Sequence, residues 1–279
     1  MLWADHIHLR CPGNIGLLGC VLQVGFPNTP KTAKYAGNWD PGARQPLSYR
    51  IQKWLLSNTR LTKNMQVLVY GDWPNQTKNI KPFFTATYRT IEIESHRTRD
   101  YKGLLKFVFV GSLVIGKRPK LAIEIIEQLH KQGRKVALDL YGEGVLRPEL
   151  EQYLEANNLN ALVTLKGNQT KAVLKQAYKD AHFSILPSKS EGWPKAIAEA
   201  MFFGAIPIVT KISCLPFMLD GGTRGVLIEP ELQEAVDKIN QALENAETLK
   251  KMSEAALTWS QKYTLDTFEY EIATLLEGE

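Results

Sequence analysis

Short apolar runs alternate with amphipathic stretches along the second part of the chain, from Lys106 onward. Six of these runs have the length and composition of strands, with helical patterns between most of them. They are Phe107–Leu113, Val136–Tyr141, Val163–Leu165, Phe183–Leu186, Ile206–Val209 and Gly225–Ile228. Because strands and helices alternate, this part predicts an α/β fold with a parallel, doubly wound sheet covered on both faces.

The part before Lys106 is less regular but also has an α/β pattern. It predicts three strands and two helices: strands at His6–Leu9, Thr32–Tyr35 and Gln66–Tyr70, and helices near Ile15–Val24 and Leu47–Leu61. A complete Rossmann-like domain has about six strands, so this part resembles the second half of one. We therefore expect a partial first domain over residues 1–104.

A polar segment at His96–Gly103, rich in Arg and Lys, is the expected link to a second domain. That second domain then covers residues 105–262. The remaining residues, 263–279, are expected to form a C-terminal helix that packs back toward the first domain.

The composition is that of a globular protein, because 44% of the 279 residues are hydrophobic and 23% are charged. The longest apolar run, Ile15 to Phe26, is shorter than the roughly 18 residues that a membrane-spanning helix needs. Three cysteines, Cys11, Cys20 and Cys214, show none of the spacings typical of zinc or iron–sulfur sites. This cysteine usage favours a reducing, cytoplasmic location.

Positive charge is concentrated in residues 1–104, which hold 14 Lys and Arg against 6 Asp and Glu, whereas the rest of the chain holds 20 against 23. The basic part is therefore expected to face an anionic partner. An anionic membrane surface, contacted peripherally from its inner side, or a lipid-diphosphate acceptor fits this charge. Nucleic acid is not expected, because the chain has no zinc-finger, RNP or basic-helix pattern.

The strongest candidate site is the stretch from Pro187 to Met201, P-S-K-S-E-G-W-P-K-A-I-A-E-A-M, which follows a buried strand and opens a helix. The first turn of a helix presents unpaired N–H groups and a partial positive charge. A strand, a polar loop and a helix start therefore make an anion-binding site. Glu191 lies in the loop and Glu199 lies two turns into the helix, so both carboxylates can contact one ligand that lies along the helix.

The E-x7-E spacing of Glu191 and Glu199, followed by Ala-Met-x-x-Gly-x-x-Pro at Ala200–Pro207, resembles the retaining glycosyltransferases of family 4. A G-x-G loop alone would be weak evidence for a family. Here several motifs of that family occur in the right order over roughly residues 105 to 260.

Three further segments carry the resemblance. Phe109–Lys117 resembles the strand and G-R-L-x-x-x-K loop of that family, Tyr141–Gly144 its G-x-G loop, and Leu165–Asn168 the segment ahead of the next helix. The resemblance implies the GT-B fold, which has two Rossmann-like domains, with the N-terminal one incomplete in this chain.

The resemblance also implies roles for individual residues. Glu191 would contact the donor sugar and Lys117 would neutralise the diphosphate leaving group, which makes these two the implied catalytic residues. Glu199 would accept hydrogen bonds from the ribose hydroxyls. The residues implied to bind the nucleotide-sugar donor are Gly111, Ser112, Gly142, Gly144, Gly192, Trp193, Lys195 and Glu199. Breaking the sugar–phosphate bond develops negative charge on the nucleoside diphosphate, which a fixed ammonium group and helix N–H groups stabilise.

Three features of the sequence bear on the mechanism and the domains that the resemblance implies. The chain contains no D-x-D triplet, so we expect a metal-independent reaction with no cofactor beyond the donor itself. Ser112 stands where the family usually has Arg, so Lys117, with Arg118 or Lys195, must supply the positive charge. Family members carry about three strands and a glycine-rich loop before the part that matches Asp5–Arg10, so we expect a truncated first domain.

The expected function is transfer of a hexose-type unit, with retention, from a UDP- or GDP-sugar to a saccharide or lipid-linked acceptor. Envelope polysaccharide or lipopolysaccharide biosynthesis is the expected setting, by analogy with the family. Two alternatives stay open. A non-catalytic nucleotide-sugar-binding remnant fits the short first domain. A Rossmann oxidoreductase would need G-x-G-x-x-G, and Gly142-Glu143-Gly144 lacks the third glycine because Arg147 occupies its position.

Overall fold

The structure is a computed structural model that describes residues 3–95 and 97–277. Their contacts divide the chain into two units. The first comprises the residues up to Phe84 together with Glu191–Trp193, and the second comprises Thr85–Ser190 and the residues from Pro194 onward. The division therefore falls after Phe84 rather than after residue 104. The expected link belongs to the second unit, and its first residue, His96, lies outside the described residues.

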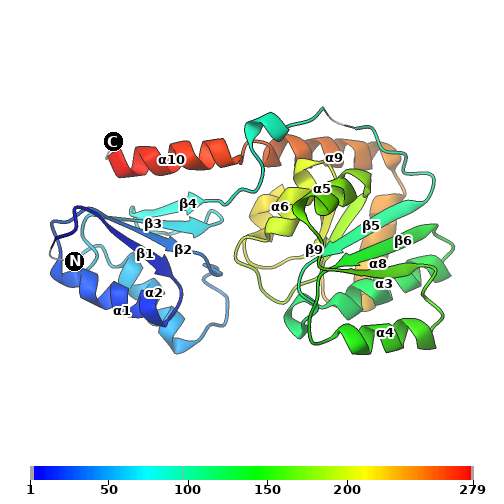
Figure 1. Ribbon diagram of the computed structural model, residues 1–279, viewed down its shortest axis with the longest axis horizontal. Coiled ribbons are helices and arrows are strands. Elements are labelled where there is room, and N and C mark those ends of the chain that lie inside the picture. The colour runs from blue at the N-terminus through cyan, green and yellow to red at the C-terminus, as the bar shows by residue number, and fades with distance from the viewer. Residues whose placement is uncertain (1–2, 96, 278–279) are drawn as a thin grey trace. The chain divides into compact units, whose positions relative to one another are not determined.

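The first unit is built on a parallel sheet (Figure 1). Its strands, in the order β1-β2-β3-β4, are β1 (Ile7–Cys11), β2 (Lys31–Tyr35), β3 (Met65–Tyr70) and β4 (Ile80–Phe83). Helices α1 (Asn14–Leu22) and α2 (Leu47–Ser57) contact each other and lie on the same face of the sheet (Figure 1). Alternate residues of β1 are buried accordingly, because successive side chains of a strand point to opposite faces.

Strand β4 corrects the sequence analysis, which predicts three strands in this part of the chain. The segment Ile80-Lys81-Pro82-Phe83 is short and combines a charge with a proline, so it lacks the apolar pattern of a strand. Pro82 has no N–H to donate to a sheet. It is tolerated because β4 pairs with β3 alone and forms an edge of the sheet.

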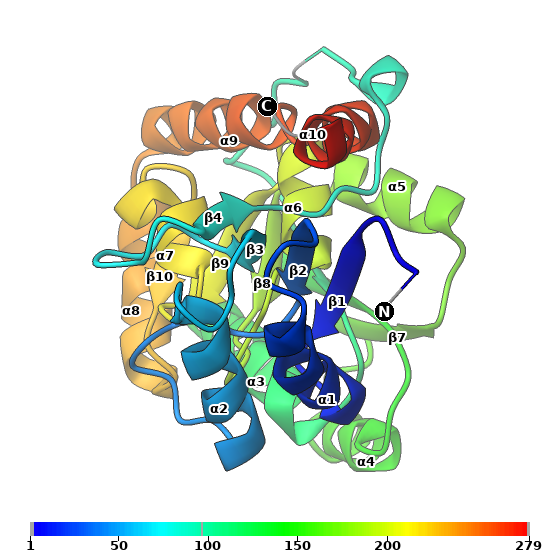
Figure 2. The same ribbon diagram turned by 90° about the vertical axis from the view of Figure 1, so that its left-hand side faces the viewer.

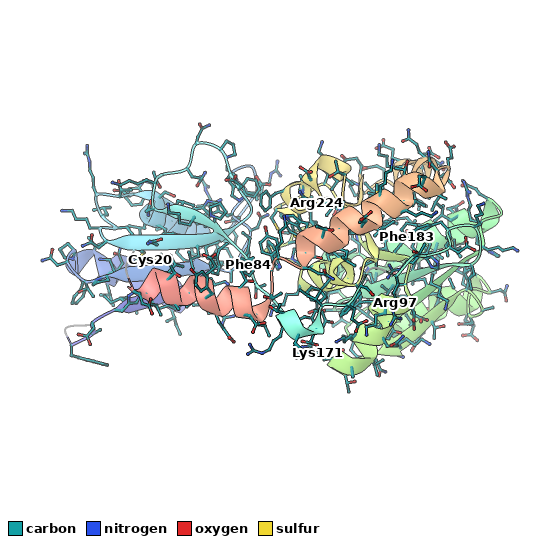
Figure 3. All side chains as sticks on the ribbon, turned by 90° about the horizontal axis from the view of Figure 1, so that it is seen from above. Cys20, Phe84, Arg97, Lys171, Phe183 and Arg224 are labelled. Carbon is teal, nitrogen blue, oxygen red and sulfur yellow. The ribbon has the colours of Figure 1, made fainter. Side chains whose placement is uncertain are left out.

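The core of the first unit lies between its sheet and the two helices. Trp39 is buried in it, with its indole N–H donating to Gln76 Oε1 at 2.9 Å and its ring 4.8 Å from that of Tyr35. Cys11 and Cys20, the latter labelled in Figure 3, are free thiols in the same core with their Sγ atoms 3.6 Å apart. Burial of these side chains, together with the hydrogen bond of Trp39, stabilises the core of the first unit.

The second unit confirms the doubly wound sheet that the sequence predicts. Its sheet has the order β10-β9-β8-β5-β6-β7, and all neighbouring strands are parallel. The strands are β5 (Leu105–Val110), β6 (Val136–Tyr141), β7 (Val163–Gly167), β8 (Phe183–Leu186), β9 (Ile206–Thr210) and β10 (Val226–Ile228). They coincide with the six apolar runs within a few residues, because buried parallel strands are apolar on both faces.

Helices cover both faces of the second sheet (Figures 1 and 2). One face carries α3 (Pro119–Lys131), α4 (Arg147–Ala156) and α8 (Leu232–Leu243), and the other carries α5 (Lys171–Asp180), α6 (Lys195–Phe202) and α9 (Ala246–Ser260). The short α7 (Leu215–Met218) follows β9. The expected C-terminal helix is present as α10 (Leu265–Glu277); residues 278 and 279 lie outside the described residues.

Residues 85–104, which we call the strap, connect β4 to β5 and belong to the second unit. Arg99 anchors the strap. Its buried guanidinium donates to five backbone carbonyls, those of Tyr178, Lys179, Ala181, Phe203 and Gly204, at 2.7–3.3 Å. These carbonyls lie at the C-terminal ends of α5 and α6, where the helix dipole favours a cation. Near the other end of the strap, Arg89 pairs with Asp266 and Glu269 of α10 at 2.8 and 2.9 Å.

Candidate functional site

The loops after β5, β6, β7 and β8 meet at one edge of the second sheet, because parallel strands all end at the same edge. Backbone hydrogen bonds join them in pairs: Leu113 N–H to Glu143 O (2.9 Å), Gly142 N–H to Gly167 O (2.9 Å) and Lys189 N–H to Gly116 O (2.8 Å). The four segments that the sequence analysis singles out therefore form one continuous rim.

Gly142 and Gly144 are required by the close approach of the β5 and β6 loops. A Cβ atom on Gly142 would lie 2.0 Å from the carbonyl oxygen of Gly111, and Gly142 has φ +141°. A Cβ on Gly144 would lie 2.4 Å from the carbonyl oxygen of Leu113. Both contacts are far inside van der Waals distance, so only glycine fits either position. The G-x-G loop thus has a packing role that needs no ligand.

The N-terminus of α6 follows the β8 loop and has no side-chain cap. Pro194 holds the N-cap position, no side chain accepts a hydrogen bond there, and the first turn contains no acidic residue. The N–H groups at a helix start carry partial positive charge. Lys195, the first residue of the helix, adds an exposed ammonium group. This arrangement is suited to an anion such as a diphosphate.

The β5 loop brings further positive charge to the same edge. Lys117 ends a short turn, Ile115–Lys117, and is partly buried. Arg118 adopts a left-handed conformation with φ +50° and donates to the carbonyl of Pro187 at 3.5 Å. Ser112, on the same loop, is exposed. The hydrogen bond between Lys189 and Gly116 ties this loop to the segment that leads into α6.

Glu199 lies on α6 with both carboxylate oxygens engaged. Oε1 accepts a hydrogen bond from the Thr87 hydroxyl at 2.7 Å, and Oε2 accepts one from the Tyr178 hydroxyl at 3.0 Å. Burial, followed by the charge of Glu199, raises the pKa of Tyr178 well above its usual range, so the phenol stays protonated and donates. A carboxylate can accept about four hydrogen bonds, which leaves capacity for a ligand.

Glu199 is partly exposed. A cavity of about 20 Å³ beside it is lined by the strap from Thr85 to Tyr88, by Lys195 and by residues of α9. This volume is enough for about one water molecule. Sequence reasoning missed Thr87 and Tyr178, because no local motif marks either residue and their contact with Glu199 joins distant parts of the chain.

The contacts of a short segment before α6, Glu191–Trp193, assign it to the first unit. Helix α6, which follows this segment, belongs to the second unit. A Cβ on Gly192 would lie 2.7 Å from the carbonyl oxygen of Ala36, and the ring of Trp193 lies 5.7 Å from that of Tyr70. Glu191 and Trp193 are buried. The E-x7-E motif therefore spans both units, which sequence spacing alone does not reveal.

The described residues form neither a metal-binding cluster nor a membrane-spanning helix. Within residues 3–95 and 97–277, no group of three or more His, Cys, Asp or Glu side chains is arranged to hold a metal ion. None of the helices described is both long enough and apolar enough to cross a membrane.

Comparison with known proteins identifies a family and several relatives of the chain. The family model described as Glycosyl transferases group 1 matches residues 91–259. Alpha-D-kanosaminyltransferase of Streptomyces kanamyceticus is 25% identical over 168 residues, 60% of this chain and 44% of that protein. The putative colanic acid biosynthesis glycosyltransferase WcaL of Salmonella typhimurium is 30% identical over 142 residues, 48% of this chain and 35% of that protein. The match thus spans less than half the length of these relatives.

Solved structures match over nearly the whole chain. Staphylococcus aureus TarM, in complex with fondaparinux, alpha-GlcNAc-glycerol and UDP, has a TM-score of 0.70 at 21% identity, covering 98% of this chain and 56% of TarM. Anabaena HepE in complex with UDP has a TM-score of 0.75 at 16% identity, covering 98% of this chain and 79% of HepE. Identities this low establish the fold alone. The fold is GT-B, with two Rossmann-like sheets.

The family match covers the strap from residue 91, all of the rim-forming loops and α6. It also extends over more than half of the chain. The chain therefore belongs to the glycosyl transferases group 1 family.

Proposed function

We propose that the protein transfers a hexose-type unit from a UDP- or GDP-sugar to a saccharide or lipid-linked acceptor, with retention, as a family 4 enzyme that uses no metal. One observation carries the proposal. The uncapped N-terminus of α6 lies at the rim, and the loop that leads into it is hydrogen-bonded to the β5 loop that carries Lys117. N–H groups and ammonium groups at one edge of a sheet are suited to binding a diphosphate, which supports the proposal.

In this proposal each residue has a defined task. Lys117, Lys195 and the first N–H groups of α6 stabilise the negative charge that develops on the nucleoside diphosphate as the sugar–phosphate bond breaks. Glu191 contacts the donor sugar. Glu199 accepts hydrogen bonds from the ribose hydroxyls, and Thr87 and Tyr178 hold its carboxylate in place. The two ammonium groups take the part that a metal ion plays in D-x-D enzymes.

The relatives support a role in envelope polysaccharide assembly. WcaL is named for colanic acid biosynthesis, and another relative, of Staphylococcus aureus, is a poly(ribitol-phosphate) alpha-N-acetylglucosaminyltransferase, 28% identical over 138 residues. HepE was solved with UDP-glucose. The three free thiols support a reducing, cytoplasmic location for this chain.

The test measures release of UDP or GDP from UDP- and GDP-hexoses in EDTA, with saccharide and lipid-linked acceptors. We expect release by the native chain. Glu199→Ala should weaken donor affinity by about 1–3 kcal/mol, roughly 5- to 150-fold, because a charged hydrogen-bonding partner is lost. Thr87→Val keeps the carboxylate but loses one of the two hydrogen bonds that hold it, so it should weaken the affinity less than Glu199→Ala does. Glu155→Ala, which changes an exposed carboxylate on α4, is the control and should retain the native affinity.

If the chain binds the donor but releases no nucleotide with any of the acceptors, the result would instead support the alternative, a non-catalytic nucleotide-sugar-binding protein. Unchanged affinity and melting temperature in Glu199→Ala would remove Glu199 from the site. The melting temperatures of all three variants are measured alongside, because Glu199 also joins the strap to α5.

A further inference from the structure

Two buried cysteines of the first unit lie in direct contact. Cys11 is the last residue of β1 and Cys20 lies on α1, and the two residues are 1% and 0% exposed. Their Sγ atoms are 3.6 Å apart and joined by a hydrogen bond. Neither thiol has a part in the proposed transfer reaction. The core of the first unit therefore contains a dithiol whose chemistry is independent of that reaction.

Two glycines of α1 bring the helix close enough to β1 for this contact. A Cβ atom on Gly19 would lie 2.7 Å from Cδ2 of Leu9, and one on Gly16 would lie 2.7 Å from the carbonyl oxygen of Arg10. A side chain at either position would push the helix away from the strand. The packing of α1 against β1 thus sets the distance between the two thiols.

A buried amide oxygen lies beside the pair. Gln52 of α2 is fully buried, and its Oε1 atom has no hydrogen-bond partner within residues 3–95 and 97–277. A Cβ atom on Gly16 would lie 3.1 Å from this oxygen and 3.2 Å from the Sγ atom of Cys11, so both atoms face the same point. Buried polar atoms without a partner are uncommon. An acceptor at this place is suited to the hydrogen bond of a hydroxyl group carried by the Cys11 sulfur.

The two thiols are chemically unequal. Because the Cys20 thiol donates its hydrogen bond to the Cys11 sulfur, the pKa of Cys11 is lowered. The same hydrogen bond, together with burial, raises the pKa of Cys20. The thiolate is the form of cysteine that attacks an oxidant. Cys11 is therefore the sulfur that reacts first, and Cys20 remains a thiol in contact with it.

We propose that Cys11 and Cys20 form a site of reversible oxidation, at which hydrogen peroxide converts the two thiols into a disulfide. The Cys11 thiolate attacks one peroxide oxygen, so an S–O bond forms and the O–O bond breaks. The hydroxide that leaves takes up the proton that Cys11 gave up and becomes water. The hydroxyl of the resulting sulfenic acid donates to Oε1 of Gln52.

The second step closes the disulfide. The Cys20 sulfur attacks the Cys11 sulfur, so the S–S bond forms and the S–O bond breaks. The departing hydroxide takes the proton of Cys20 and leaves as a second water. The thiols have then lost two electrons, which the peroxide has gained.

Hydrogen peroxide is small enough to reach this pair when the surrounding elements open locally. Strand β1 lies at an edge of the first sheet, and α1 contacts it through glycines rather than large side chains. Elements with few large buried contacts open at a lower free-energy cost than the centre of a core. A reducing environment keeps the pair as thiols, and a rise in peroxide shifts it to the disulfide.

This inference does not rest on the proposed transfer reaction, and it is tested on the full chain without donor or acceptor. The folded, reduced chain is treated with graded hydrogen peroxide, the remaining thiols are alkylated after unfolding, and the peptides are identified by mass spectrometry. We expect the peptides of Cys11 and Cys20 to appear linked, and lighter by two hydrogen atoms than the two thiol peptides together. Dithiothreitol should restore both thiols.

Cys214 is the matched control within the same chain. It is a cysteine of the second unit with 1% exposure, whereas the other two cysteines belong to the first unit. Its thiol should be lost roughly tenfold more slowly than those of the pair, because it lacks a neighbouring thiol that lowers its pKa. In Cys20→Ala no linked peptide should form, and dimedone should trap a sulfenic acid at Cys11.

The proposal would be overturned if the thiols of Cys11 and Cys20 outlast that of Cys214, or if they end as separate sulfinic acids without a linked peptide. A link that forms only in unfolded chain, which circular dichroism of the treated sample detects, would overturn it as well. The result on the native chain is decisive even where Cys20→Ala does not fold, because it needs no substitution.

Discussion

At the residue scale, two glycines of the rim, Gly142 and Gly144, both match a family motif and are required by local packing. The G-x-G loop matches a family pattern, yet Gly142 is fixed by the carbonyl oxygen of Gly111 and Gly144 by that of Leu113. The β5 and β6 loops approach so closely that neither position has room for a side chain, and this holds without a nucleotide. The identity of the glycines could be predicted from the sequence, but their physical reason required the distances between loops.

Gly142→Ala is therefore expected to destabilise the second unit without any ligand present. The added Cβ meets a backbone oxygen at 2.0 Å, and φ +141° disfavours any other residue. We expect a loss of about 2 kcal/mol or more in the free energy of unfolding. Melting monitored by circular dichroism should fall by roughly 4–8 °C.

Gly116→Ala is the matched control for that substitution. Gly116 lies in the adjoining β5 loop, but a Cβ there would meet nothing within 4 Å. Its melting temperature should stay close to that of the native chain. Equal melting temperatures for the two variants would contradict the packing role of Gly142.

At the element scale, one arginine of the strap bridges two helix ends of the second unit. Arg99 donates to five backbone carbonyls at the C-termini of α5 and α6. Burial lowers its pKa, but a guanidinium remains charged at any ordinary pH. The strap also carries Thr87, which donates to Glu199. Its attachment therefore bears on the candidate site.

Arg99→Ala should lower the free energy of unfolding of the second unit by about 3 kcal/mol, because buried carbonyls lose their donors. Arg97→Ala, two residues earlier, is the control. Arg97 is 58% exposed and makes one ion pair at 3.6 Å with Glu94, so its loss should cost less than about 1 kcal/mol. Chemical denaturation of both variants measures the difference. Similar losses would show that Arg99 does not anchor the strap.

At the scale of the whole molecule, the sequence predicted the second sheet well and the first less completely. The strands of the second sheet are buried on both faces and leave continuous apolar runs, whereas β4 tolerates Lys81 and Pro82 because it is an edge. The order of the site segments was predictable. The hydrogen bonds of Glu199 with Thr87 and Tyr178 were not, because they depend on how distant segments pack.

We propose that the second unit binds the nucleoside diphosphate of a sugar donor through ammonium groups and the start of α6, without a metal ion. Calorimetric titration of UDP and GDP into the full chain in EDTA measures this binding, with Lys117→Ala and the control Lys120→Ala beside it. Lys120 lies on α3 and pairs with Glu149, so its loss should leave the affinity unchanged.

We expect binding of at least one of the two nucleotides in EDTA. The affinity should be roughly tenfold lower in Lys117→Ala, because one charge-assisted contact is lost. Binding of neither nucleotide, or binding only after magnesium is added, would contradict this proposal.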